Sequence, residues 1–167
     1  MKTYTTPLPP DQMAIFQSLV EKHFGEVATA HGFQLENLSP SLFGFLTSCA
    51  IVTIGVYPGH NPAVCIKLRE RKPGDKLGEN DQRSIGLGVV LKYLVSMAQI
   101  KPVDTDYDKL ELSEKIAVQA AHLAQYGKPY LTNPNADWKG LRTWLDVKIK
   151  KGRTEMKELL EKMGIKS

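Results

Sequence analysis

Residues 43–70 read FGFLTSCAIVTIGVYPGHNPAVCIKLRE, and this stretch decides the fold. β-Branched and aromatic residues dominate it, while Pro, Gly and Asn gather at residues 58–62, as they do between paired strands. A weaker break, Thr47-Ser48, follows Leu46. We interpret it as a turn between two strands, because fifteen unbroken residues would exceed the usual length of a strand. The stretch therefore predicts three strands.

The last two of these strands alternate in polarity. Their apolar positions fall on one side, and the opposite side of the same strands carries Tyr57, Lys67 and Arg69. One apolar and one mixed face are typical of an antiparallel sheet with a single face on a core. The apolar positions are Val52, Ile54, Val56, Val64, Ile66 and Leu68.

Helical patterns flank the strands. A stripe at intervals of three and four predicts a helix over residues 11–30, and we expect Phe16, Leu19 and Phe24 to pack on the apolar face. A further strand is expected at 33–38. A helix whose N-terminal region includes Ser84 is indicated by Leu87, Val90, Leu91, Leu94 and Val95. A strand at 85–91 is the alternative because of Gly86 and Gly88. The fold class is α+β: an antiparallel β-meander of three to four strands packed with an N-terminal helix and a helical C-terminal half.

The C-terminal half should hold three helices. The first runs from Leu112 to a stop at Gly127, and residues 129–135 form a loop. Asn135 or Asp137 then caps a helix that begins near Trp138. Lys151-Gly152 is expected to break that helix, leaving a last short one over residues 156–163.

Length and composition favour one α+β domain over residues 1–167. Three prolines predict an extended arm at 1–10, and the polar run at 71–83 predicts a mobile surface loop. No apolar run approaches the ~18 residues that a membrane span requires. The N-terminus also lacks the apolar segment of a signal peptide, so we expect a cytoplasmic protein with no membrane partner.

Residues that could carry chemistry are present but poorly arranged for it. Cys49 and Cys65 lie in apolar stretches of the sequence and lack other Cys or His residues at the spacing of metal ligands, so we expect two reduced, structural thiols. His60 is a turn histidine. Asp104, Asp106 and Asp108 resemble the start of a calcium loop, but lysines replace its glycine and its last ligand. We expect no catalytic residue, no metal and no cofactor, although an enzyme site assembled from distant positions stays open.

Positive charge is concentrated at the C-terminus. Residues 138–167 hold nine basic and four acidic residues, whereas the whole chain has a net charge of +4. A cluster here could contact the phosphates of a polyanion. Interleaved glutamates are also typical of an ordinary solvated helix face, which is the favoured interpretation. The residues of this possible contact are Lys148, Lys150, Lys151 and Arg153.

The layout resembles a known group of proteins. A leading helix closes on His31-Gly32-Phe33, and a later one closes on Tyr126-Gly127. Leu131 and Asp137-Trp138-Lys139-Gly140-Leu141 follow. This order, from Asp11 to Leu145, is similar to small bacterial α+β proteins of unknown function, including the immunity-type proteins of polymorphic toxin systems. The resemblance implies a protein partner and transfers no functional residue.

We therefore expect a non-enzymatic protein-binding domain, with an immunity-like inhibitor as its particular form. The alternative is a nucleic-acid-associated accessory protein that uses the basic C-terminal segment. Tyr and Arg are enriched in binding hot spots, so we place the partner site on the mixed sheet face. Its expected residues are Tyr57, Lys67, Arg69 and Arg71. The competing interpretation is that a second helix layer covers this face.

Overall fold

The computed structural model describes residues 8–59, 61–78 and 83–165. It divides into two compact units, Met1–Ala136 and Asp137–Ser167. Of the predicted arm at 1–10, residues 1–7 lie outside the described part. Pro10 belongs to the first helix. The prediction of a single domain over residues 1–167 stays a prediction.

The first helix, α1 (Pro10–Ala30), begins and ends as its sequence indicates. Pro10 is tolerated at the first helical position because the N–H that it lacks would have no partner inside the helix. At the other end, Gly32 adopts a φ of +76°, and the Phe33 N–H donates to the Ala28 carbonyl at 2.8 Å. A left-handed glycine of this kind satisfies the last helical carbonyls.

The sheet is a simple meander. It consists of β1 (Glu36–Ser39), β2 (Leu42–Leu46), β3 (Ala50–Tyr57), β4 (Ala63–Glu70) and the two-residue β5 (Ile85–Gly86). Each strand pairs antiparallel with the next in the chain. The α+β prediction is confirmed, although the meander has five strands where three to four were expected. β1 starts later than expected, and β5 occupies the start of the segment predicted as helix or strand.

The turn between β2 and β3 owes its shape to Thr47. Its hydroxyl oxygen accepts from the backbone N–H groups of Ala50 at 2.8 Å and Cys49 at 3.1 Å. Thr47 is fully buried, so these bonds satisfy groups that water cannot reach. The Thr47-Ser48 break is thus a true turn, and the prediction of two separate strands is confirmed.

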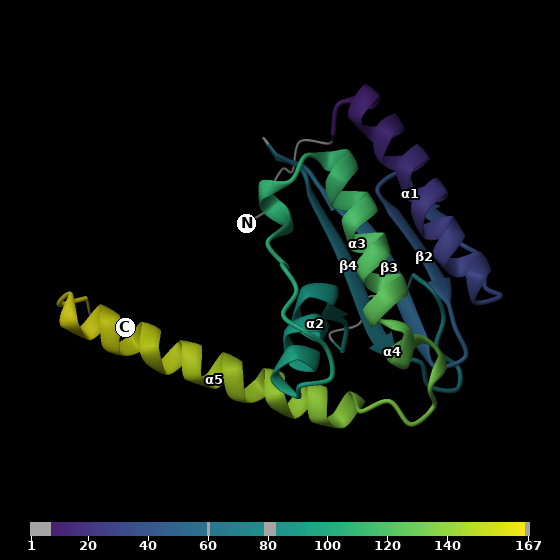
Figure 1. Cartoon of the computed structure of the whole chain (residues 1–167). Coiled ribbons are helices and arrows are strands. Elements are labelled where there is room, and N and C mark those ends of the chain that lie inside the picture. The colour runs from purple at the N-terminus through teal and green to yellow at the C-terminus, as the bar shows by residue number, and fades with distance from the viewer. Residues whose placement is uncertain (1–7, 60, 79–82, 166–167) are drawn as a thin grey trace. The chain divides into compact units, whose positions relative to one another are not determined.

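One face of the sheet is the core. The six predicted apolar residues of β3 and β4 are all buried, and α1 and α3 (Leu112–Tyr126) cover them (Figure 1). The ring of Phe16 packs edge-on against that of Phe43, with centroids 6.0 Å apart. The expected contact residue Leu19 is only half-buried, because it lies at the border of the stripe, and Val20 is buried instead.

Two buried polar side chains of α3 reach the start of β4. Lys115 Nζ donates to the Pro62 carbonyl at 2.7 Å and lies 3.3 Å from Asn61 Oδ1. One turn further on, Gln119 Nε2 donates to the Val64 carbonyl at 3.1 Å. Lys115 is fully buried, and among the described residues it forms no ion pair. The long lysine therefore acts as a hydrogen-bonding clamp between helix and strand.

The remaining elements of this unit are short. β5 leads directly into α2 (Leu87–Ser96), a 3₁₀ turn η1 (Tyr107–Lys109) precedes α3, and α4 (Lys128–Thr132) follows it. The prediction of a loop at 129–135 was wrong for its first residues. Pro129 lies in the first turn of α4, where proline does not interrupt a helix.

The second unit is a long helix, α5 (Trp138–Lys162). The Asp137 carboxylate accepts from the Gly140 N–H at 2.8 Å, which confirms Asp137 as the N-cap. The predicted break at Gly152 was wrong, since α5 continues through it. None of the helices in the described residues is long and apolar enough to cross a membrane.

Candidate functional site on the outer face of the sheet

The outer face of the sheet is the side opposite α1 and α3. It contains a hollow of about 220 Å³ over the middle of β2, β3 and β4. The two faces differ because the side chains of a strand alternate, so the residues between the core positions line the hollow. Those that bear on its chemistry are Leu42, Thr53, Gly55, Tyr57, Cys65 and Lys67.

Gly55 is a glycine that the chain's own packing does not require. It lies in the interior of β3, and a Cβ built there would meet its nearest neighbour, Leu42 Cδ1, at an ordinary 3.5 Å. Gly44 differs, since a Cβ there would lie 2.8 Å from the Val52 carbonyl oxygen and 2.7 Å from Leu77 Cδ1. Glycine inside a strand often marks the close approach of another group. The missing side chain at Gly55 helps to leave the hollow empty.

Tyr57 and Lys67 are accessible on this face. Tyr57 is 50% exposed and Lys67 is exposed, so both can meet a partner without any change in the fold. Between them lies the half-buried Cys65, a free thiol whose pKa is raised by burial. A raised pKa keeps the thiol protonated at neutral pH, and a protonated thiol is a poor nucleophile.

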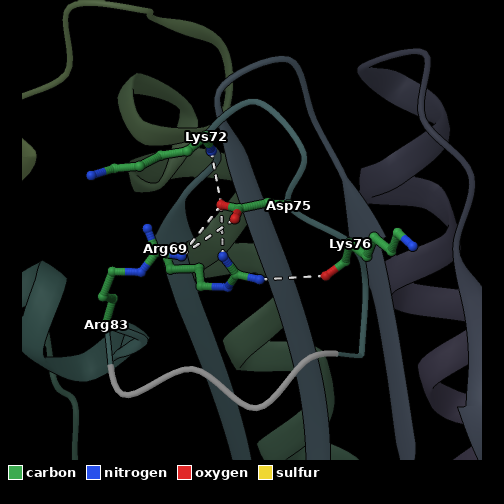
Figure 2. Close-up of polar contacts among 5 residues, drawn as sticks. All are labelled: Arg69, Lys72, Asp75, Lys76 and Arg83. Carbon is green, nitrogen blue, oxygen red and sulfur yellow. Dashed lines mark hydrogen bonds and ion pairs between the residues drawn. The ribbon is translucent and has the colours of Figure 1, made fainter.

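Arg69 faces the same side but turns inward. Its side chain is only 3% exposed, and its Nη1 forms an ion pair with Asp75 Oδ2 at 2.8 Å (Figure 2). Asp75 also accepts from the Lys72 N–H at 2.9 Å and lies 3.4 Å from Arg83 Nη2. The Lys72 N–H lowers the pKa of Asp75 most, and Arg69 and Arg83 lower it further. Asp75 is therefore the centre of a small charged cluster.

The ion pair fixes part of the segment predicted as a mobile loop. Residues 71–78 turn back over one end of the outer face, where the Arg69 guanidinium meets Asp75 and the Lys76 carbonyl. The half-buried Leu77 lies against Gly44 of β2. Residues 79–82 of the predicted loop lie outside the described part, so its mobility stays a prediction.

Arg71 is also engaged within the chain. Its Nη1 donates to the Thr47 carbonyl at 2.7 Å, and its backbone N–H donates to the Cys49 carbonyl at 2.9 Å. The four predicted partner-binding residues thus divide into two pairs. Tyr57 and Lys67 line the hollow with accessible side chains, whereas Arg69, which also lines it, is paired with Asp75, and Arg71 holds the neighbouring turn. Binding by any of them stays a prediction.

The predicted polyanion residues all lie on α5 and are exposed. Helical residues are separated by about 100°, so Lys148, Lys150, Lys151 and Arg153 point to different sides of the helix. Lys151 pairs with Glu155 at 3.8 Å, and Lys148 lies over the Trp144 ring, 5.5 Å from its centroid. Nothing in this arrangement gathers them on one side, and phosphate contact stays a prediction.

A second polar cluster involves the aspartates compared above with a calcium loop. Lys109 Nζ forms an ion pair with Asp104, so a cation of the chain itself meets that carboxylate. Nearby, the Tyr107 hydroxyl and His122 Nδ1 are 2.8 Å apart. Burial raises the pKa of Tyr107 to about 12 and lowers that of His122, so both are neutral at pH 7. Among the described residues, no group of three His, Cys, Asp or Glu could hold a metal.

Sequence reasoning missed several residues of the outer face. In the sequence, Thr53 and Gly55 stand out only as alternate residues of a strand, and Asp75 is one of several charged residues in the predicted loop. The signal that could have found Gly55 is a glycine in the centre of a β-branched strand without a turn. His60, considered above as a turn histidine, lies outside the described residues. Comparisons with protein-family models, with curated proteins and with solved structures found no match to this chain.

Proposed function

We propose that this chain is a non-enzymatic, cytoplasmic protein-binding domain whose outer sheet face receives a segment of a partner protein. The observation that carries the proposal is the hollow over Gly55, flanked by the accessible side chains of Tyr57 and Lys67.

The size of the hollow favours a protein partner over a small molecule. Sites for drug-sized ligands usually measure about 300–1,000 Å³, whereas this one measures about 220 Å³ and opens onto the surface. It is large enough for one or two side chains. A partner would therefore insert a side chain above Gly55 and extend over the neighbouring strands.

The flanking chemistry indicates the kind of segment that would fit. Lys67 offers an exposed ammonium group to a carboxylate, and Tyr57 offers a ring with a hydroxyl at its end. The adjacent arginines are engaged within the chain, so Lys67 supplies the accessible charge at the hollow. We therefore expect an acidic partner segment with an apolar or aromatic side chain beside the carboxylate.

A binding role also suits the titratable groups of the hollow. The Cys65 thiol is protonated at neutral pH, and the Arg69 guanidinium is paired with Asp75. Neither group is prepared for nucleophilic or acid–base work. This chemistry supports recognition rather than a reaction.

The test is capture from the native host with the intact chain as bait. The wild type should be compared with Tyr57→Ala and Lys67→Glu, and Lys22→Glu on α1 provides a matched charge change at another exposed position. A true partner should bind each of the first two variants more weakly, with a loss of about 1–2 kcal/mol or more in binding free energy. It should bind Lys22→Glu as tightly as it binds the wild type. If no protein distinguishes Lys67→Glu from Lys22→Glu, the proposal fails.

The particular form of the proposal is an immunity-like inhibitor. It requires that the captured protein be a toxin whose activity the purified chain blocks, and that Lys67→Glu weaken the block. The nucleic-acid alternative predicts a different response to the variants. Its binding should weaken steeply with salt and with Lys150→Glu and Lys151→Glu, and should not respond to Lys67→Glu.

A further inference from the structure

Apolar side chains lie along one stripe of α5 from Leu145 to Met163, with a gap at Gly152. With Gly152 counted, the positions of the stripe recur at alternating intervals of four and three, the spacing of the seam of a coiled coil. Every residue from 146 to 159 is exposed. Such a helix normally gains most of its stability by packing its apolar stripe against something. The seam positions are Leu145, Ile149, Gly152, Met156, Leu159 and Met163.

From this stripe we infer that α5 forms an antiparallel coiled coil with α5 of a second copy of the chain. The argument for a second copy is charge complementarity. The positions that flank the seam hold Asp146 and Arg153 on one side and Lys148 and Glu155 on the other, followed towards the C-terminus by Leu160 and Lys162 respectively. In coiled coils these flanking positions set partner and orientation.

One antiparallel register satisfies all four charges. Opposing Ile149 to Gly152 of the second copy places Lys148 opposite Glu155 and Asp146 opposite Arg153, each pair occurring twice by symmetry. A shift of one heptad in one direction opposes Glu155 to Glu155 and Arg153 to Arg153, and a shift in the other opposes Lys148 to Lys148. A parallel pair would bring Lys148 against Arg153. Of these arrangements, only the first gives all four charges an opposite partner, and it places Lys162 opposite the uncharged Leu141.

The same register suits the exposed part of α5 and its glycine. The exposed residues 146–155 of one copy then lie opposite residues 155–146 of the other. Gly152 falls in the central layers, facing Ile149 of the other copy. A Cβ at Gly152 would meet nothing within 4 Å in the chain itself, and glycine weakens a helix interior. Its small size becomes useful where a branched side chain of a second helix approaches.

Sedimentation equilibrium of the full chain tests the inference. We expect a monomer–dimer equilibrium in the micromolar range. Lys148→Glu should weaken the dimer about tenfold, because two attractive pairs become repulsive. Adding Glu155→Lys should restore it. Lys150→Glu, the same charge change away from the seam, is the matched control and should leave the dimer unchanged.

Circular dichroism should accompany each variant, so that loss of the helix is not mistaken for loss of the dimer. A chain that stays monomeric with α5 intact would overturn the inference. So would a dimer that responds equally to Lys148→Glu and Lys150→Glu, since it would form through another surface. A monomer whose α5 instead binds vesicles containing phosphatidylserine would show that the stripe meets a membrane surface, and would overturn it as well.

Discussion

Arg69 Nη1, near the end of β4, lies 2.8 Å from Asp75 Oδ2, and the arginine side chain is almost completely withdrawn from water. This ion pair changes the interpretation of both Arg69 and the polar run at 71–83. An arginine expected at a binding surface belongs to the interior, and a polar run expected to be mobile has one fixed point. The outer face is therefore half closed by residues 71–78 and half open at Tyr57 and Lys67.

Replacing Arg69 should damage the fold. We expect Arg69→Ala to lower the free energy of unfolding by about 3 kcal/mol, because it removes one side of a largely buried ion pair together with its packing. Lys67→Ala, two residues earlier and exposed, should change it by about 0.5 kcal/mol or less. Urea unfolding measures both. Equal effects would mean that the pair contributes nothing to stability.

Acidification should reveal the charge on Asp75. Its pKa in the folded chain is below the ordinary 3.8, so the unfolded chain takes up the proton first as the pH falls. The stabilising contribution is therefore complete above about 3.8 and is lost as the pH falls through the folded-state pKa. Asp75→Asn should flatten the acid limb of the unfolding free energy. Parallel pH curves for the variant and the wild type would contradict this.

The two strand glycines should respond differently to the same substitution. Gly44→Ala should lower the free energy of unfolding by about 1–3 kcal/mol, since its Cβ would press on the Val52 carbonyl oxygen and on Leu77. Gly55→Ala should leave the free energy of unfolding equal or slightly higher, because its Cβ has room. Thermal unfolding of the two variants side by side decides it. A marked loss at Gly55 would remove the argument that this glycine is kept for a partner.

Lys115 should tolerate a matched substitution better than truncation. Lys115→Ala removes two hydrogen bonds and leaves a cavity, so we expect a loss of about 3 kcal/mol in the free energy of unfolding. Lys115→Met preserves most of the volume and also removes the cost of a buried charge, so its loss should be much smaller. Chemical denaturation separates the two. If Lys115→Met lowers the free energy of unfolding as much as Lys115→Ala, the contribution of Lys115 comes mainly from its hydrogen bonds to Pro62 and Asn61.

The strands were predictable because their signal is local. Alternation fixes which residues share a face, so the common face of Tyr57, Lys67 and Arg69 followed from their spacing alone. The burial of Arg69 did not, since it depends on where residues 71–78 turn back after β4. Lys115 and Gln119 were missed for the same reason. Their partners are carbonyl groups some fifty residues away, at Pro62 and Val64.

Two errors in the helices come from reading glycine and proline as stops. Gly32 does end a helix, and it does so in the left-handed conformation that ends helices. Gly152 is also a glycine within a helical stretch, but it keeps helical geometry and α5 continues through it. Pro129 indicated a loop, yet it lies where a helix accepts proline. Residue type alone does not reveal which of these backbone conformations is adopted.

The strand order of the sheet, which follows the chain order without exception, bears on how the molecule folds. The hairpins from β1 to β4 close short loops, so the loss of chain entropy on forming this part of the meander is small, whereas β5 joins only after the longer connection of residues 71–84. The packing of α1 with α3 joins segments almost a hundred residues apart, and their docking has to wait until the intervening sheet exists. We expect β3 and β4 to be paired in the transition state and α1 to join after it. Substitutions in the central hairpin should then slow refolding, whereas substitutions in α1 should mainly speed unfolding.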